Sequence, residues 1–244
     1  TRPPEVIDGA IGHYNFSVDT CITAGTWTAA TAAAACAHAA AGVVAAGQGP
    51  AFALARPPGH HAHADLFGGY CYLNNAAIAA ETLRGAGADR VAVLDIDYHV
   101  GNGTQAIFYD RPDVLFLSIH ADPAEEFPYF LGAADETGEG AGEGLTANYP
   151  LPRGTDYDGW AAALEDACTR IVAFGADALV VSLGVDTYEG DPISRFRLAG
   201  GDFPKVGTRL AGIALPTVFV MEGGYAVEAL GDNVTGVLRG FSGG

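Results

Sequence analysis

The stretch VLDIDYHVGNGTQ (residues 93–105) places a short apolar run directly before Asp95, Asp97 and His99. Side chains of an extended chain alternate between two faces, so these three polar residues share one face and the apolar residues between them share the other. A buried strand that ends in two carboxylates and an imidazole indicates a functional site at its carboxyl end.

Similar apolar runs occur along the rest of the chain and alternate with helix-like segments. Strands are predicted at residues 51–55, 91–96, 114–119, 178–183 and 217–221, and helices at 26–48, 73–85, 104–109, 157–174, 202–214 and 227–238. Continuous apolar runs are typical of parallel strands covered on both faces. The alternation predicts an α/β fold with three layers, in which a mostly parallel, doubly wound sheet has helices on both faces.

The composition suits one globular domain over residues 1–244, with 49% hydrophobic and 17% charged residues. No uninterrupted apolar run reaches spanning length, so we expect a soluble, cytoplasmic protein that does not bind a membrane. Four cysteines without a CxxC pair predict reduced thiols rather than a disulfide scaffold or a zinc finger.

The net charge of −17 argues against binding to nucleic acid, because a phosphate backbone would be repelled. The same charge favours a small cationic ligand, although a merely solvated acidic surface explains it equally well.

Polar motifs follow four of the predicted strands: RPPGHH (56–61), DIDYH (95–99), GVD (184–186) and EGGY (222–225). In open parallel sheets ligands bind at the carboxyl ends of the strands, so these motifs are expected to converge. Asp97, His99 and Asp186 would offer a divalent metal two carboxylates and one imidazole, with a position left open for water and substrate. Zinc fits this donor set, and iron, cobalt or manganese are alternatives.

The same motifs supply groups for proton transfer. One histidine of the pair His60–His61 could take a proton from water and return it to a leaving amine, while Tyr225 donates a hydrogen bond to an oxyanion. An aspartate that follows a strand is by itself more often a cap or turn residue, so the argument rests on the convergence. No G-x-S-x-G elbow is present, and the motifs together favour a metal-assisted hydrolase.

The motifs RPPGHHA, GGYCYLNNAAIAA, DIDYHVGNGTQ, FLSIH, GVDT and EGGY occur in the order seen in the histone deacetylase superfamily, which the chain resembles over nearly its whole length. The long loop after residue 118 and the segment VVSLGVDTYEGDPIS resemble the bacterial acetylpolyamine amidohydrolases. The resemblance implies the arginase/deacetylase fold and removal of acetyl groups from acetylated amines, with acetylpolyamines favoured. Acetyl-lysine proteins or small acyl esters remain alternative substrates, and a non-catalytic metal- or amine-binding module is a third reading.

The resemblance also implies a role for each matched residue. The zinc ligands would be Asp97, His99 and Asp186. His61 would be the general base and acid, oriented by Asn102, and His60 an electrostatic helper oriented by Asp95. Tyr225 would stabilise the oxyanion. The arginases, which share this fold, hold two manganese ions and need further carboxylates close after the shared ligands. The sequence after His99 and Asp186 has no such carboxylates at the matching positions, so one catalytic metal is expected.

A potassium ion near the zinc is implied as well, with Asp95 and Ser118 as its side-chain ligands. Tyr70 and Phe127 resemble the aromatic walls of a narrow substrate channel, and Gly69 fits a loop that approaches the substrate closely.

Relative to the family, the chain is expected to lack an N-terminal segment. Its absence would leave either a more open site or an uncovered surface that a homo-oligomer buries. The resemblance to the polyamine enzymes implies that this homo-oligomer is a dimer. Asp8 and Asp19 fall where those enzymes supply acidic residues at the channel mouth.

Overall fold

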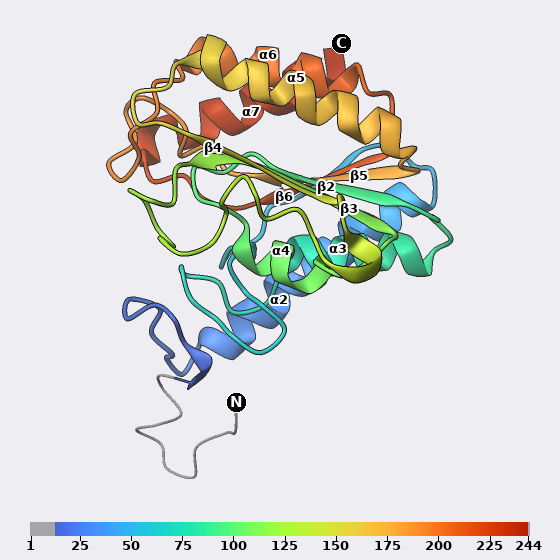
Figure 1. The fold of residues 1–244 in the computed structure, drawn as a ribbon, viewed down its shortest axis with the longest axis horizontal. Coiled ribbons are helices and arrows are strands. Elements are labelled where there is room, and N and C mark those ends of the chain that lie inside the picture. Colours follow the sequence, from blue (N-terminus) through green and yellow to red (C-terminus); the bar gives the residue numbers. More distant parts are fainter. Residues whose placement is uncertain (1–12, 244) are drawn as a thin grey trace.

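The computed structural model describes residues 13–243, and one six-stranded sheet forms its centre (Figure 1). The strands lie in the order β1-β6-β5-β2-β3-β4, and every neighbouring pair is parallel. Their bounds are Ala51–Ala53 (β1), Val91–Asp95 (β2), Val114–Ala121 (β3), Thr146–Leu151 (β4), Ala178–Leu183 (β5) and Thr217–Met221 (β6). The predicted parallel α/β sheet is confirmed.

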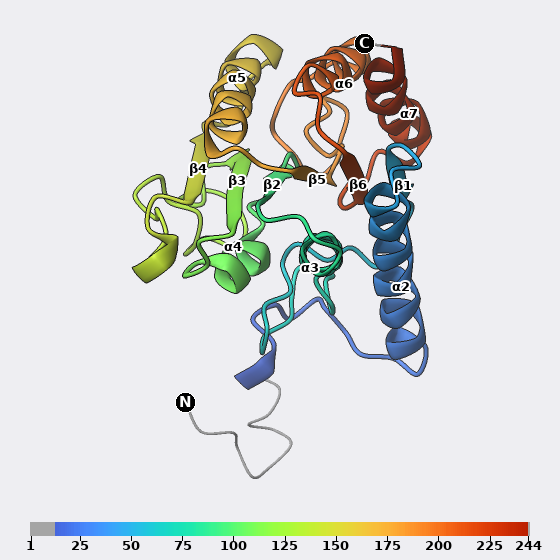
Figure 2. The ribbon, with the colours of Figure 1, turned by 90° about the vertical axis from the view of Figure 1, so that its right-hand side faces the viewer.

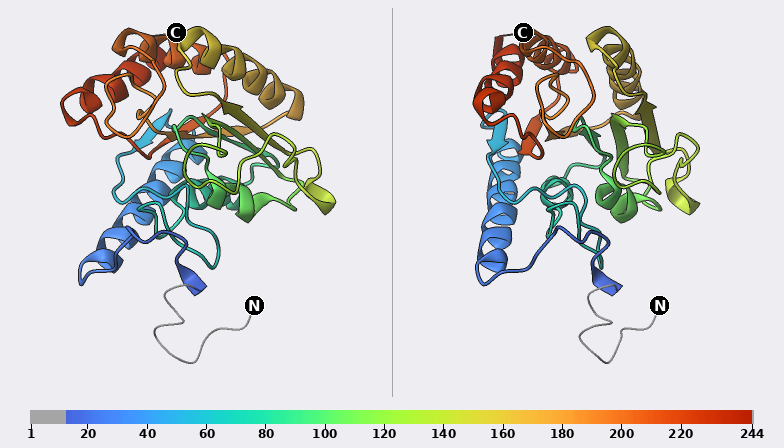
Figure 3. Two further views of the ribbon diagram at one scale, coloured as in Figure 1. Left: turned by 60° about the vertical axis from the view of Figure 1, so that its left-hand side comes forward. Right: turned by 90° about the vertical axis from the view of Figure 1, so that its left-hand side faces the viewer.

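Helices cover both faces of this sheet, as Figures 1 and 2 show. On one face lie α5 (Tyr157–Phe174), α6 (Phe203–Ala211) and α7 (Val227–Gly243), and on the other lie α2 (Thr26–Ala45), α3 (Asn75–Gly85) and α4 (Asn102–Phe108). Short 3₁₀ helices occupy Gly140–Gly142 and Gly200–Asp202. The further views in Figure 3 show the same two helical layers with the strands between them.

Strand β2 explains why the central runs are apolar without alternation. Ala92 and Leu94 belong to the hydrophobic cluster under α5, α6 and α7, whereas Val91 and Val93 belong to the cluster that includes α2 and α3. Both faces of the strand are therefore buried, which is the pattern of a strand in the middle of a three-layer fold.

Helix α2 has the length and hydropathy of a membrane-spanning helix, alone among the helices of residues 13–243. Its small residues form a face that packs on α3 and β1. The buried members of that face are Ala30, Ala33, Ala37, Ala40, Ala41 and Val44. Close packing of this alanine-rich face accounts for the third of the apolar window that is buried.

One strand and several element ends differ from the sequence expectation. Strand β4 was not predicted, because Asn148 and Pro150 interrupt its apolar run; it lies at the sheet edge beside β3, where a proline is tolerated. Helix α3 begins at Asn75, two residues later than expected, because the Asn74 side chain accepts a hydrogen bond from the Ala77 amide at 2.9 Å. Helix α4 begins two residues earlier than expected, at Asn102.

Strand β3 contains, next to its last residue, a histidine that should make the fold sensitive to acid. His120 is buried; its Nε2 donates to the Gly132 carbonyl at 2.9 Å, and its Nδ1 accepts from the Ser118 hydroxyl at 2.8 Å. Burial lowers the pKa of His120 to about 4. The unfolded chain, with a histidine pKa of about 6.5, takes up the proton first, so stability falls as the pH falls from about 6.5 to 4.

Denaturant unfolding from pH 7 to 4 should therefore show a loss of up to about 3 kcal/mol that is attributable to His120. The variant His120→Gln, which cannot titrate, should show a shallower decline over the same range. Parallel pH curves for the two proteins would contradict this assignment.

Candidate active site

The ends of β2 and β5, neighbours in the middle of the sheet, bring together Asp97, His99 and Asp186. All three are buried, and their potential ligand atoms lie within 4.8 Å of one another. His99 Nδ1 lies 3.2 Å from Asp97 Oδ1 and 3.1 Å from Asp186 Oδ2. Strand β2 ends at Asp95, so Asp97 and His99 lie in the bend beyond it rather than on a continuing strand.

Backbone amides hold the two carboxylates in place. The Gly223 amide donates to Asp97 Oδ2 and the Tyr98 amide donates to Asp186 Oδ1, each at 2.8 Å. A Cβ at position 223 would lie 2.6 Å from Asp97 Oδ2, so the EGGY loop needs a glycine to approach this closely. Each carboxylate keeps its other oxygen beside His99.

This donor set fits a divalent metal ion. With ligand bonds of about 2.0–2.1 Å, neighbouring ligand atoms of a tetrahedral zinc ion lie about 3.3 Å apart, close to the spacing found here. Burial and the Asp97 carboxylate raise the pKa of Asp186 to about 7, which reflects the cost of two buried carboxylates side by side. A cation held between them would remove that repulsion.

The adjacent histidines have opposite environments although their ring centroids are only 4.0 Å apart. Burial opposes a charge on His60, but Asp95, whose Oδ2 lies 2.9 Å from His60 Nδ1, and Asp97 raise the pKa of His60 well above its usual value. Burial and the charge of His60 lower the pKa of His61 well below its usual value. His61 is thus a neutral base beside a charged neighbour, the separation of roles that proton-transfer sites use.

Tyr225 is held by an aspartate that the sequence analysis did not assign. Asp191 Oδ2 accepts from the backbone amides of Tyr225 at 2.7 Å and Ala226 at 3.1 Å. Burial and the nearby Asp186 carboxylate raise the pKa of Tyr225, so its hydroxyl keeps the proton and can act as a hydrogen-bond donor. The only sequence signal for Asp191 is its place in the loop that follows Asp186.

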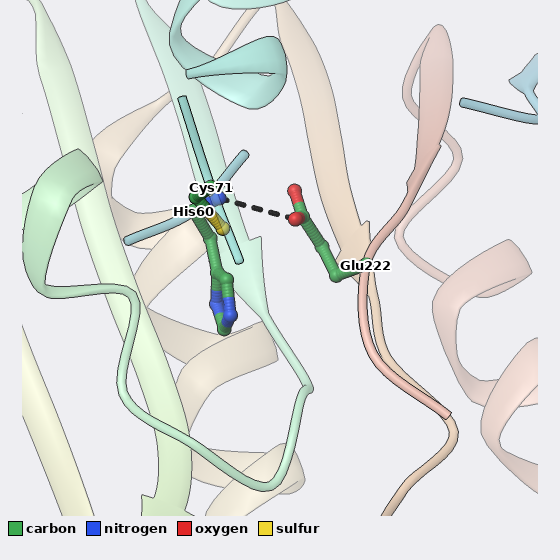
Figure 4. A group of neighbouring side chains, drawn as sticks. All are labelled: His60, Cys71 and Glu222. Carbon is green, nitrogen blue, oxygen red and sulfur yellow. Dashed lines mark hydrogen bonds between the residues drawn. The ribbon is translucent and has the colours of Figure 1, made fainter. Parts of the chain in front are cut away.

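Glu222 is a second residue that sequence reasoning missed (Figure 4). Its Oε2 accepts from the amides of Gly59 at 2.7 Å and His60 at 3.1 Å, which ties the histidine loop to the end of β6. Cys71 completes this buried group, where burial raises the pKa of its thiol. Figure 4 shows the His60 imidazole pointing away from Glu222, and its Nδ1 already pairs with Asp95, so we interpret the group as a hydrogen-bonded support and not as a metal site.

Aromatic side chains lie close to His61 and Tyr225. The Phe127 ring lies nearly perpendicular to the His61 ring, with 5.0 Å between the ring centroids. It also stacks on the Phe16 ring, with the centroids 5.8 Å apart. The ring centroids of Tyr70 and Tyr225 are 6.1 Å apart. Phe16 was not predicted, since nothing in its local sequence marks it.

The acidic residues expected at the channel mouth have different outcomes. Asp19 lies near Tyr70, one of the expected channel walls, and burial and the Asp19 carboxylate raise the pKa of Tyr70. Asp8 lies outside the described residues.

Ser118, the expected potassium ligand, lies level with Asp95 on the neighbouring strand β3. Both side chains are fully buried. Asp95 accepts from the Asp97 amide at 3.1 Å and contacts His60, and Ser118 donates to His120.

Gly69 lies directly against His61, and replacing it should disturb catalysis. Its φ is +55°, and a Cβ there would lie 2.2 Å from His61 Cδ2. We expect Gly69→Ala to lower kcat by about 10²-fold, because the imidazole must move.

Gly140→Ala provides a matched control for that variant, since Gly140 has the same φ of +55° but nothing within 4 Å of an added Cβ. Both variants should lose about 1–2 kcal/mol of stability through backbone strain. Equal kcat values for the two would show that His61 does not depend on the glycine.

Comparison with known proteins gives the family of the chain. Residues 5–241 match the histone deacetylase domain model. The chain is 58% identical to acetylpolyamine amidohydrolase 1 of Pseudomonas aeruginosa over 98% of its own length and 69% of the relative's. It is 55% identical to the acetylpolyamine amidohydrolase of Mycoplana ramosa over 99% and 71%.

Among solved structures, the crystal structure of acetylpolyamine aminohydrolase from Burkholderia pseudomallei superposes with a TM-score of 0.89 at 46% identity, over 91% of this chain and 65% of that one. The chain thus spans about two thirds of the length of these relatives. With nearly all of its residues matched by the domain model, the chain belongs to the histone deacetylase domain family.

Proposed function

We propose that this protein is a metal-dependent amidohydrolase that removes acetyl groups from acetylated polyamines and releases acetate and the free amine. One observation carries the proposal: His61 lies at the same buried site as Asp97, His99 and Asp186, with its ring centroid 6.0 Å from that of His99. The neighbouring His60 pairs with Asp95, which favours a charge on His60 and a neutral His61. This combination supplies a metal site and a general base within reach of one substrate bond.

The residues divide the reaction between them. A divalent metal held by Asp97, His99 and Asp186 would supply polarisation of the acetamide carbonyl and of the attacking water. His61 accepts the proton of that water at Nε2 and later donates it to the leaving amine, while the Tyr225 hydroxyl donates a hydrogen bond to the oxyanion of the tetrahedral intermediate.

We propose zinc as the metal, since two carboxylates and an imidazole suit it, with iron, cobalt or manganese as alternatives. A potassium ion is proposed at Asp95 and Ser118, where the two side chains share one register of adjacent strands. A homodimer is a further proposal from the family resemblance, and a cytoplasmic location is a proposal from the composition.

Acetylpolyamines are the proposed substrates for two reasons. Relatives that are 55–58% identical over nearly the whole chain carry the name acetylpolyamine amidohydrolase. The net charge of −17 also favours a substrate with free ammonium groups.

The deciding experiment compares acetate release from N-acetylputrescine, an acetyl-lysine peptide and an aryl acetate at equal concentrations, with metal-free protein reloaded with zinc. We expect the highest kcat/KM with N-acetylputrescine. A higher value for the peptide or the ester would replace the proposed substrate. Inactivity on all three, with zinc bound, would leave a metal- or amine-binding module.

A further inference from the structure

A third histidine, His63, is connected to the proposed general base, His61, through the side chain of Asn102. Asn102, the first residue of α4, is buried between two imidazoles. Its Oδ1 lies 2.6 Å from His61 Nδ1, and its Nδ2 lies 2.9 Å from His63 Nε2. His63 follows the catalytic pair by two residues in the stretch GHHAH and had no role in the sequence analysis.

The two ends of an amide side chain are not interchangeable, because the oxygen only accepts hydrogen bonds and the nitrogen only donates them. The observed orientation therefore requires a proton on His61 Nδ1, which leaves Nε2 with the lone pair needed by a general base. A reversed amide would present Nδ2 to His61 Nδ1 and would favour the proton on Nε2. In that tautomer His61 could not accept a proton from water.

In the observed orientation Asn102 Nδ2 donates to His63 Nε2, so the His63 proton lies on Nδ1, and the reversed amide would require the opposite tautomer of both imidazoles. Asn102 is the only side-chain hydrogen-bond partner of His63 within residues 13–243. The ring is held in place by an edge contact with Phe16 at 5.9 Å and by a turn in which the His63 amide donates to the Leu66 carbonyl at 2.9 Å. Burial lowers the pKa of His63, although the charge of Asp65 acts in the opposite direction. At neutral pH the ring is therefore uncharged, and one of its nitrogens can accept a hydrogen bond.

We propose that His63 is a positioning residue, which holds the Asn102 amide in the orientation that keeps the His61 proton on Nδ1. This inference rests on the proposed function, because it assigns His63 to the same general base. In this proposal His63 acts only through Asn102, and its contacts with Asn102, Phe16 and Leu66 include none of the proposed metal ligands.

The first test removes the acceptor at position 63. His63→Leu should lower kcat about tenfold and leave KM unchanged, since one hydrogen bond no longer favours the active tautomer. His63→Gln, whose side-chain oxygen can accept from Asn102, should restore kcat to within about threefold of the original protein. Equal losses in the two variants would assign the effect to packing against Phe16 and overturn the proposal.

The second test repeats His63→Leu in an Asn102→Asp background. A carboxylate accepts through either oxygen, so it holds the His61 proton on Nδ1 in both orientations. The tenfold effect of His63→Leu should then shrink to less than about twofold, whatever the basal rate of the Asn102→Asp protein. The same tenfold loss in both backgrounds would show that His63 does not act through Asn102.

A direct readout is the ¹⁵N NMR spectrum of the histidines in the zinc-loaded protein without substrate, with His61 assigned from its absence in a His61→Gln variant. We expect a protonated Nδ1 and an unprotonated Nε2 in the original protein, and a mixture of tautomers in His63→Leu. An unchanged tautomer overturns the proposal. Because this spectrum needs no turnover, it decides the role of His63 even if every acetylated substrate proves inert.

Discussion

Replacing Asp186 with alanine should lower kcat/KM for N-acetylputrescine by about 10³-fold or more, because the variant loses one of three ligands of the proposed metal. Asp186 Oδ2 lies 3.1 Å from His99 Nδ1, and within residues 13–243 the only other carboxylate grouped with this site is Asp97, itself a proposed ligand. The zinc content of the purified variant, measured by elemental analysis after dialysis, should fall well below one ion per chain.

Asp177→Ala is the matched control for this change. Asp177 also accepts hydrogen bonds from backbone amides, those of Asp89 and Arg90, but it is exposed and precedes the other end of β5. The control should keep its zinc and its activity. If Asp186→Ala kept both as well, the metal would have to bind elsewhere.

The second large effect is expected at His61. His61→Ala should lower kcat by about 10²- to 10⁴-fold, the usual contribution of a general base, while zinc binding persists because His61 is not among the proposed ligands. Burial and His60 lower the pKa of His61, so the base stays unprotonated well below pH 6.5 and activity should fall only when the pH drops through that lowered value.

The pH profile separates this role from a structural one. The acid limb of kcat/KM that His61 causes should vanish in the residual activity of His61→Ala. His38→Ala is a suitable control, since His38 is an exposed residue of α2 whose side chain bonds to Thr82. A His61→Ala protein with nearly full kcat would remove His61 from the mechanism.

The sequence predicted the strands and the ligand-type side chains, because the position of each depends mainly on one physical cause. Strands buried on both faces must be apolar, so the four central strands could be read from their apolar runs. The short edge strand β1 is apolar as well, whereas β4 at the other edge was missed because Asn148 and Pro150 break its apolar run. The ligand-type side chains were predictable because the ends of parallel strands converge.

Supporting contacts were much harder to predict from the sequence. Glu222 and Asp191 bind backbone amides, and which amides they meet depends on the course of loops that carry no periodic signal. The contact between His63 and Asn102 could not be predicted for a similar reason. Asn102 lies on another element, and only the folded chain brings the two side chains together.

The strand order gives the proposed metal a further property. Asp97 follows β2 and Asp186 follows β5, and these strands are neighbours only once the two halves of the chain have joined across the middle of the sheet. Neither half alone can assemble the ligand set, so partly folded chains gain nothing from the ion. The binding free energy of the ion therefore raises the free energy of global unfolding, and it stabilises only the chain in which the sheet is complete.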